Sequence, residues 1–148
     1  MEVVEAAPDF AAHVRRCFAV RKHATVATVR RDGSPRISGS EVEFAADGEI
    51  YLGMMPASRK ALDLRRDPRL ALHSPTEDPP EDDPSAWLGD AKIAGRAVEV
   101  SDPGRSDEPH RFRIAVDEVV VVMVAPAGDH LLIRSWHPGR DLEVHERH

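Results

Sequence analysis

Apolar side chains near the N-terminus recur with the spacing of one face of an α-helix. The recurring positions, at i, i+4, i+7 and i+8, are Phe10, Val14, Cys17 and Phe18. Asp9 is a residue type that caps helices, and Pro8 marks the point where the helix begins. The pattern therefore predicts an amphipathic helix from Asp9 to about Lys22, within an N-terminal segment 1–22.

Most of the remaining chain consists of short runs rich in β-branched residues, separated by turn residues. Asp32-Gly33 and Asp47-Gly48 are typical hairpin turns, and Gly95 inside a run predicts a bulge or a close backbone approach. The predicted strands are Thr25–Arg30, Pro35–Phe44, Glu49–Met54, Arg69–His73, Asp90–Val100, Glu118–Ala125 and Leu131–Trp136.

A second helix is predicted from Ser58 to about Arg66, because Pro56 and Ala57 end the strand before it and Pro68 stops it. Three polar segments complete the pattern. Residues 74–86 form an acidic, proline-rich loop, in which Ser74–Ser85 holds four prolines, five acidic residues and no cation. The other two are a loop at Ser101–His110 and a C-terminal tail over residues 137–148.

These elements predict one mainly β domain over residues 1–148, with six to seven antiparallel strands and two or more helices. Strands joined by short turns favour a closed or partly closed barrel, since closure removes exposed edges. The continuous apolar run Val119–Val124 lacks a polar face and predicts a strand buried on both sides. A helix or a second subunit would have to cover its outer side.

Composition narrows the classes of partner. The formal net charge of −6 argues against general nucleic-acid binding. The sequence has no run of about 18 apolar residues that could span a membrane. Its first ten residues, MEVVEAAPDF, are acidic where a signal peptide would be basic. The single cysteine, Cys17, excludes an internal disulfide. Together these features lead us to expect a cytoplasmic protein.

The strongest chemical signal is Ser58-Arg59-Lys60 at the start of the second predicted helix. Free backbone N–H groups and the positive end of the helix dipole favour an anion at such a place, and two cations add to this. A solvated cap with surface charges is the alternative interpretation. Arg65, Arg66 and Arg69 could either pair with Asp63 and Asp67 or hold an anionic coenzyme tail.

At this point the chain resembles the pyridoxamine 5′-phosphate oxidase-like flavoproteins, which are flavin-binding split β-barrels. The matching stretches are TVATVRRDGSPRISGSEVEF, IYLGMMPASRKALDLRRDPRLAL, KIAGRAVEV and SWHPGR. They cover most of residues 23–140. The chain departs from the true pyridoxamine phosphate oxidases at Ile37–Glu41 and lacks their C-terminal substrate-phosphate motif, so we do not expect it to oxidise pyridoxamine phosphate.

The resemblance implies a set of cofactor-binding residues. Ser58, Arg59 and Lys60 would hold the cofactor phosphate, and a strip of the second strand from Arg36 to Ser40 would lie beside the flavin ring. A C-terminal segment would lie near the cofactor, often donated across a dimer. The implied residues are Arg36, Ile37, Ser38, Gly53, Met54, Met55, Ser58, Arg59, Lys60, Lys92, Trp136 and Arg140.

The resemblance also implies a function. A homodimer would bind FMN, or the deazaflavin coenzyme F-420, at the subunit interface and pass a hydride between the cofactor and a small organic substrate. No catalytic side chain is predicted, because the cofactor carries the hydride. The alternatives are a flavin or haem carrier without turnover and a dimer that has lost its cofactor site. Haem is a minor option, and no metal site is predicted from the eight histidines.

Overall fold

A computed structural model of the protein describes residues 1–102, 104–105 and 107–148. The helices are α1 (Glu2–Ala6), α2 (Pro8–Ala19), α3 (Arg59–Arg66) and the short 3-10 helix η1 (Pro84–Ala86). The two predicted helices are confirmed as α2 and α3, and α1 was not predicted. Pro8 begins α2, but Ala7 is its N-cap and Asp9 lies within the first turn, so the predicted Asp9 cap was wrong. The helix also ends three residues before Lys22. Its apolar stripe is buried, with Phe10 and Val14 each 2% exposed.

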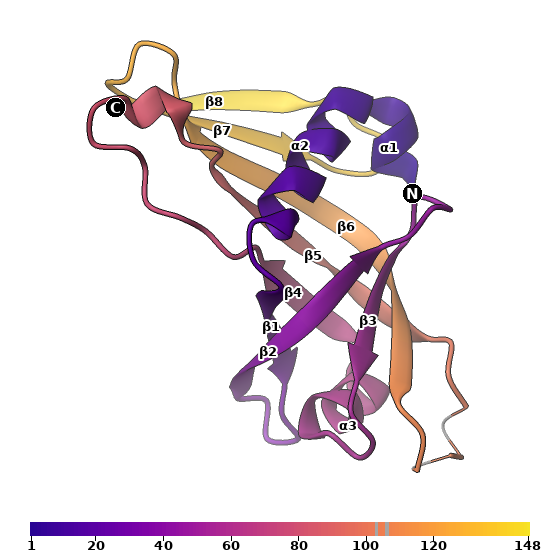
Figure 1. The fold of residues 1–148 in the computed structure, drawn as a ribbon. Coiled ribbons are helices and arrows are strands. Elements are labelled where there is room, and N and C mark those ends of the chain that lie inside the picture. The colour runs from indigo at the N-terminus through magenta and orange to yellow at the C-terminus, as the bar shows by residue number, and fades with distance from the viewer. Residues whose placement is uncertain (103, 106) are drawn as a thin grey trace.

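In the described part of the chain, six strands close into a barrel and two more extend it (Figure 1). The strands are β1 (His23–Val29), β2 (Pro35–Phe44), β3 (Ile50–Met54), β4 (Arg69–His73), β5 (Asp90–Glu99), β6 (His110–Val124), β7 (Leu131–Trp136) and β8 (Glu143–Arg147). Neighbouring strands run in the order β3-β2-β1-β4-β5-β6-β7-β8, all antiparallel, and a β3–β6 pairing completes the barrel. The predicted split barrel is confirmed.

The predicted bulge at Gly95 is present, because the β5–β6 register shifts between Ala94 and Gly95. A Cβ atom added at Gly95 would lie only 2.2 Å from the backbone oxygen of Ala115. Glycine is therefore required here by the close approach of two strands.

The sequence interpretation was wrong at two further places among the described residues. The strand predicted at Glu118–Ala125 is part of β6, which has 15 residues and begins at His110, the last residue of the loop predicted at Ser101–His110. Pro103 and Ser106 of that loop lie outside the described residues. The segment taken as a tail contains β8, an edge strand exposed at every position. It pairs with β7 through backbone hydrogen bonds. Because neither face of β8 is buried, its sequence shows no alternation of hydrophobic and polar residues.

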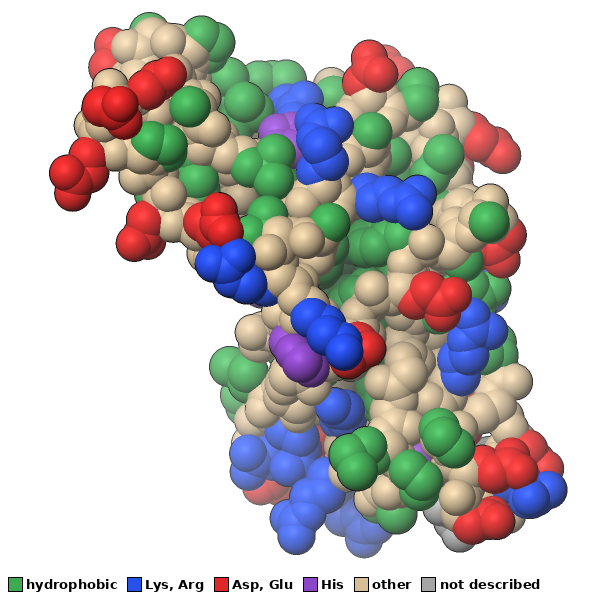
Figure 2. Space-filling view, viewed as in Figure 1, with side chains coloured by type: hydrophobic (Ala, Val, Ile, Leu, Met, Phe, Trp, Pro, Cys, Tyr) green, Lys and Arg blue, Asp and Glu red, His purple; other side chains and the backbone are tan. Residues whose placement is uncertain are grey.

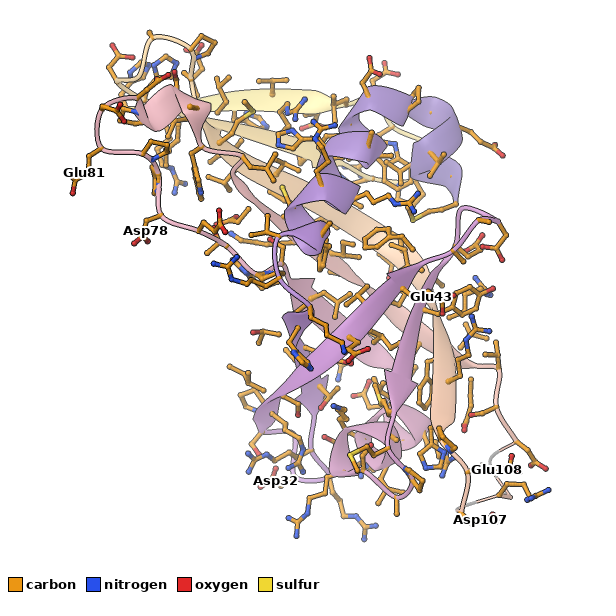
Figure 3. The ribbon with its side chains drawn as sticks, viewed as in Figure 1. Asp32, Glu43, Asp78, Glu81, Asp107 and Glu108 are labelled. Carbon is orange, nitrogen blue, oxygen red and sulfur yellow. The ribbon has the colours of Figure 1, made fainter. Side chains whose placement is uncertain are left out.

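The run Val119–Val124 is buried on one side only within the single chain. Val119 and Val121 are fully buried, whereas Val120 and Val122 are half-buried. The acidic segment 74–86 is a loop apart from η1, as predicted, and Asp78 and Glu81 point outward from it (Figure 3). None of the helices in the described part of the chain has the length and apolar character needed to cross a membrane.

Candidate functional site

The site is built around the N-terminus of α3, where the chain turns sharply after β3. Ala57 has a positive φ of 59°, and its N–H donates to Nε2 of His110, 3.0 Å away. Ser58 is the N-cap, and its Oγ accepts from the N–H of Ala61 at 3.4 Å. Since the first turn of a helix has more N–H groups than one cap can serve, backbone donors remain available to an anion.

A groove of about 610 Å³ opens beside α3, between β2 and β3. Gly39 and Gly53 line it, and at both positions an added Cβ would meet nothing within 4 Å. Met54 and Met55 add apolar surface. The groove therefore offers a bare stretch of backbone bordered by thioethers, a surface on which a flat ring can lie.

Lys60 lies at the α3 side of this groove. Its Nζ donates to the backbone oxygen of Gly39 over 2.7 Å, which ties the helix to β2. Burial lowers the pKa of the Lys60 ammonium from its ordinary value. The charge is therefore held in a partly desolvated position, where an anion would be attracted more strongly than at the open surface.

Arg59 faces a different hollow on the other side of α3, which we name the arginine pocket. It has a volume of about 470 Å³ and is lined by Arg30, Arg31, Asp32, Arg36, Arg59, Leu62, Asp63 and Arg66. Lys and Arg side chains gather at this end of the molecule, around α3 and the β1–β2 turn that carries Asp32 (Figures 2 and 3). Five arginines against two carboxylates make this hollow strongly cationic.

Asp63 anchors α3 and lines the arginine pocket. Its carboxylate accepts from Thr28 Oγ1 at 2.8 Å, Arg36 Nε at 2.7 Å and Arg66 Nη2 at 3.0 Å. The residue is only 3% exposed. Burial by itself would raise its pKa, but the hydrogen bonds from Arg36, Thr28 and Arg66 outweigh burial and hold the pKa below its ordinary value. A charged, fully bonded Asp63 thus holds the helix against β1 and β2.

Comparison with known proteins decides the family. A family model described as pyridoxamine 5′-phosphate oxidase matches residues 10–125. The chain belongs to this family. The matched region runs from α2 to the end of β6, so it contains both the groove and the arginine pocket and leaves out β7 and β8. The resemblance of the sequence to the pyridoxamine 5′-phosphate oxidase-like split barrels is confirmed.

Solved structures share the fold of this family member. A pyridoxamine 5′-phosphate oxidase-related, FMN-binding protein from Nostoc punctiforme has a TM-score of 0.64 and 11% identity, with 98% of this chain and 96% of that chain covered. A haem-binding protein from Mycobacterium smegmatis has a TM-score of 0.54 and 18% identity, with 91% and 57% covered. An F420 reductase has a TM-score of 0.52 and 14% identity, with 71% and 94% covered. A search of curated proteins found no match.

The structure separates the residues that the family resemblance implied. Gly53, Met54, Met55 and Lys60 come together in the groove. Arg36 and Arg59 face the arginine pocket. Ser58 is the N-cap of the helix that carries Arg59 and Lys60. These seven residues and Gly39 therefore surround one helix start.

Other implied residues lie apart from the groove within one chain. Lys92 is on β5, two strands beyond β1 in the sheet, and is exposed. Trp136 is 1% exposed and belongs to the core, and Arg140 lies in the turn after β7. Ile37, 75% exposed, and Ser38 are on β2 but are not among the described residues that line the groove. Their roles in binding stay predictions.

The arginines that follow the helix start are largely engaged in ion pairs. Arg66 pairs with Asp63, and Arg69 pairs with Asp67, as one of the two interpretations expected. Arg65 instead forms a two-pronged contact with Glu99, with Nη2 to Oε1 at 2.7 Å and Nε to Oε2 at 3.0 Å. Nη2 of Arg65 also lies 3.0 Å from Nδ1 of His110, whose Nε2 accepts from the N–H of Ala57. This network therefore supports the turn at Ala57.

Sequence reasoning missed several residues of the site. Glu41 and Glu43 line the groove and are paired with Lys22 and Arg111, respectively. Strand alternation could have found them, because residues 39, 41 and 43 share one face of β2. Glu43 is labelled on β2 in Figure 3. His110 had no local signal, since β6 reaches the helix start only through barrel closure.

Proposed function

We propose that this protein binds a flavin-type cofactor, FMN or the deazaflavin F-420, in the groove between β2, β3 and α3, and acts as an oxidoreductase on a small organic substrate. The observation that carries the proposal is the position of Lys60, whose partly buried ammonium lies where a bare-backbone groove meets a helix N-terminus. Family membership and the FMN-binding and F420 reductase neighbours support it.

The groove fits the ring of such a cofactor. Its volume of about 610 Å³ lies within the range of roughly 300–1,000 Å³ that is usual for ligand sites. The open faces at Gly39 and Gly53 let a planar ring approach the main chain, whose N–H and C=O groups can bond to ring atoms. The bound flavin would supply the hydride chemistry. The protein's own tasks are to fix the ring, hold its phosphate and leave one face open.

The phosphate would lie against the first turn of α3. The N–H groups of that turn can donate to an anion, and Lys60 would reach it from the groove side while Arg59 would reach it from the arginine pocket. Arg59 is exposed and can reorient toward a ligand without breaking a buried contact. Two cations on opposite sides of one helix end would clamp a doubly charged group.

A homodimer with the cofactor at its interface forms part of the proposal. Three large apolar side chains are exposed near the two hollows: Ile37 at 75%, Met55 at 79% and Leu62 at 48%. Hydrophobic side chains lie beside the cationic patch at the α3 end in Figure 2. Exposed apolar groups that border a ligand site favour coverage by a second chain. That chain could also bring Trp136 or Arg140 near the cofactor, as the family resemblance implies.

The decisive experiment is to purify the protein, record its visible spectrum and identify the released cofactor by mass spectrometry. We expect FMN or the deazaflavin, either copurified or taken up on addition, at one per chain. Reduction of the bound cofactor followed by substrate-dependent reoxidation would establish an enzyme, and tight binding with neither step accelerated would establish a carrier. Haem, or no uptake of any cofactor, would overturn the flavin proposal. His23 lines the groove and is a candidate haem ligand in that case.

Substitution tests the position of the phosphate. Arg59→Ala and Lys60→Ala should each weaken flavin binding about 10- to 150-fold, since a charged hydrogen bond contributes roughly 1.5–3 kcal/mol. The double variant, which loses both cations, should bind more weakly than either single variant. Arg96→Ala is the matched control, because it removes an exposed cation paired with Asp117, away from both hollows. Circular dichroism should show that each variant is folded. If Lys60→Ala and Arg59→Ala bind as tightly as Arg96→Ala, the phosphate lies elsewhere.

A further inference from the structure

A second chemically distinct cluster lies at the far edge of the sheet, where β7 begins and β8 ends. In the β7–β8 pairing Leu131 lies opposite Arg147 and Leu132 lies opposite Glu146. One step beyond the last pair, this register brings His130 opposite His148. Residues directly opposite each other in an antiparallel pair share a face, and Glu146, two residues before His148, is on that face too.

Side-chain distances agree with the register. Nε2 of His130 lies 3.6 Å from Oε1 of Glu146, and Nε2 of His148 lies 3.7 Å from Oε2 of the same carboxylate. The two imidazole rings are stacked, with centroids 4.6 Å apart. One ligand atom from each of the three residues lies within 4.8 Å of the others. Two ligands of a tetrahedral zinc ion are about 3.3–3.4 Å apart, given bonds of about 2.0–2.1 Å.

His130 is already oriented like a metal ligand. Its Nδ1 is 2.7 Å from Oδ1 of Asp129, which leaves Nε2 to face Glu146. Nε2 is buried and has no hydrogen-bond partner in the described part of the chain. A carboxylate on the far nitrogen of a ligating histidine is the usual way in which proteins fix the ring orientation and tautomer. The His130 side chain is 13% exposed, so one ligand is held in place while Glu146 and His148 are free to adjust.

We propose that His130, Glu146 and His148 form a binding site for a divalent transition cation, with Zn²⁺ as the representative ion and Asp129 as the positioning residue. Two imidazoles and one carboxylate suit zinc, and three protein ligands leave a fourth position for water. A bound ion would link the exposed edge strand β8 to the start of β7. It lies outside the groove and the arginine pocket, so it does not depend on flavin binding.

The test is a titration of the full chain, freed of metal by chelation, with Zn²⁺ followed by calorimetry and with Co²⁺ followed by its visible absorption. We expect one ion per chain and a Co²⁺ spectrum of low coordination number. His148→Ala and Glu146→Gln, which change exposed side chains, should each weaken Zn²⁺ binding more than tenfold. Asp129→Asn should weaken it about 10- to 100-fold, the usual effect of losing such a positioning contact.

His145→Ala is the matched control. His145 is also an exposed histidine of β8, but it alternates to the opposite face and contacts Glu143. Its loss should leave Zn²⁺ affinity unchanged. The proposal is wrong if His148→Ala binds Zn²⁺ as tightly as the parent chain, or if His145→Ala weakens binding as much as His148→Ala. The second result would mean that histidines bind the ion diffusely.

Discussion

Replacing Asp63 by asparagine tests the anchor of the helix that carries the proposed phosphate site. The substitution keeps the shape of the side chain but removes the charge that faces Arg36 and Arg66. Breaking a buried ion pair by removing one partner costs about 3–5 kcal/mol. The Arg36 and Arg66 side chains are 20% and 34% exposed, so water can partly solvate the guanidinium groups left behind. We therefore expect the free energy of unfolding to fall by about 3 kcal/mol, the lower end of this range.

Urea unfolding followed by circular dichroism measures this loss directly. For a chain of this size the melting temperature should fall by about 6–12 °C, at roughly 2–4 °C per kcal/mol. Asp117→Asn is the control, because Asp117 pairs with Arg96 while their side chains are 51% and 60% exposed. Exposed pairs of this kind contribute about 0–1 kcal/mol. If Asp63→Asn loses no more stability than Asp117→Asn, then the buried carboxylate does not anchor the helix.

The pH dependence gives an independent check on Asp63. Its pKa in the folded protein lies below its ordinary value of 3.8, so the unfolded chain binds a proton more readily than the folded one. The carboxylate therefore stabilises the fold fully above pH 3.8, and this contribution is lost as pH falls through the folded pKa. We expect the stability difference between the parent chain and Asp63→Asn to be constant near neutral pH and to shrink in acid. A difference independent of pH would contradict an electrostatic role.

Two further predictions concern the barrel and the buried thiol. Gly95→Ala should lower the free energy of unfolding in urea by more than about 1 kcal/mol, because its Cβ would lie 2.2 Å from the Ala115 backbone oxygen. Gly39→Ala is the control: its Cβ would meet nothing within 4 Å, so the free energy of unfolding should change by no more than about 0.5 kcal/mol. Equal effects would mean that the strands are not packed this closely. Cys17 is fully buried, and burial raises the pKa of its thiol to about 11, so a thiol reagent at pH 8 should label it only after denaturation. Rapid labelling of the native protein would place Cys17 at the surface.

The features that the sequence predicted are those with local causes. Pro35–Phe44, Arg69–His73 and Leu131–Trp136 have the bounds that their β-rich runs and flanking turns indicated. Ser58 caps α3 because a hydroxyl before a helical run satisfies a free N–H group wherever it occurs. The family resemblance was also readable, since its motifs are contiguous stretches of chain.

The features that sequence reasoning missed depend on contacts between distant segments. The strand β8 has no apolar alternation, because it is an exposed edge strand whose pairing uses the backbone alone. His110 and Arg65 support the turn at Ala57 only because β6 pairs with β3 across the barrel seam. Contacts of this kind leave no periodic signal in the sequence.

The amino-acid sequence by itself determined most of the elements, the family and a cationic helix start at Ser58-Arg59-Lys60. Only the tertiary structure decided how those cations are used. Successive residues on a helix point about 100° apart, so Lys60 enters the groove while Arg59 faces the arginine pocket. The β7–β8 register likewise brings His130 to His148, which are 18 positions apart in the chain. A sequence specifies local conformation through neighbouring residues, whereas a site is assembled from side chains that only the closed sheet places together.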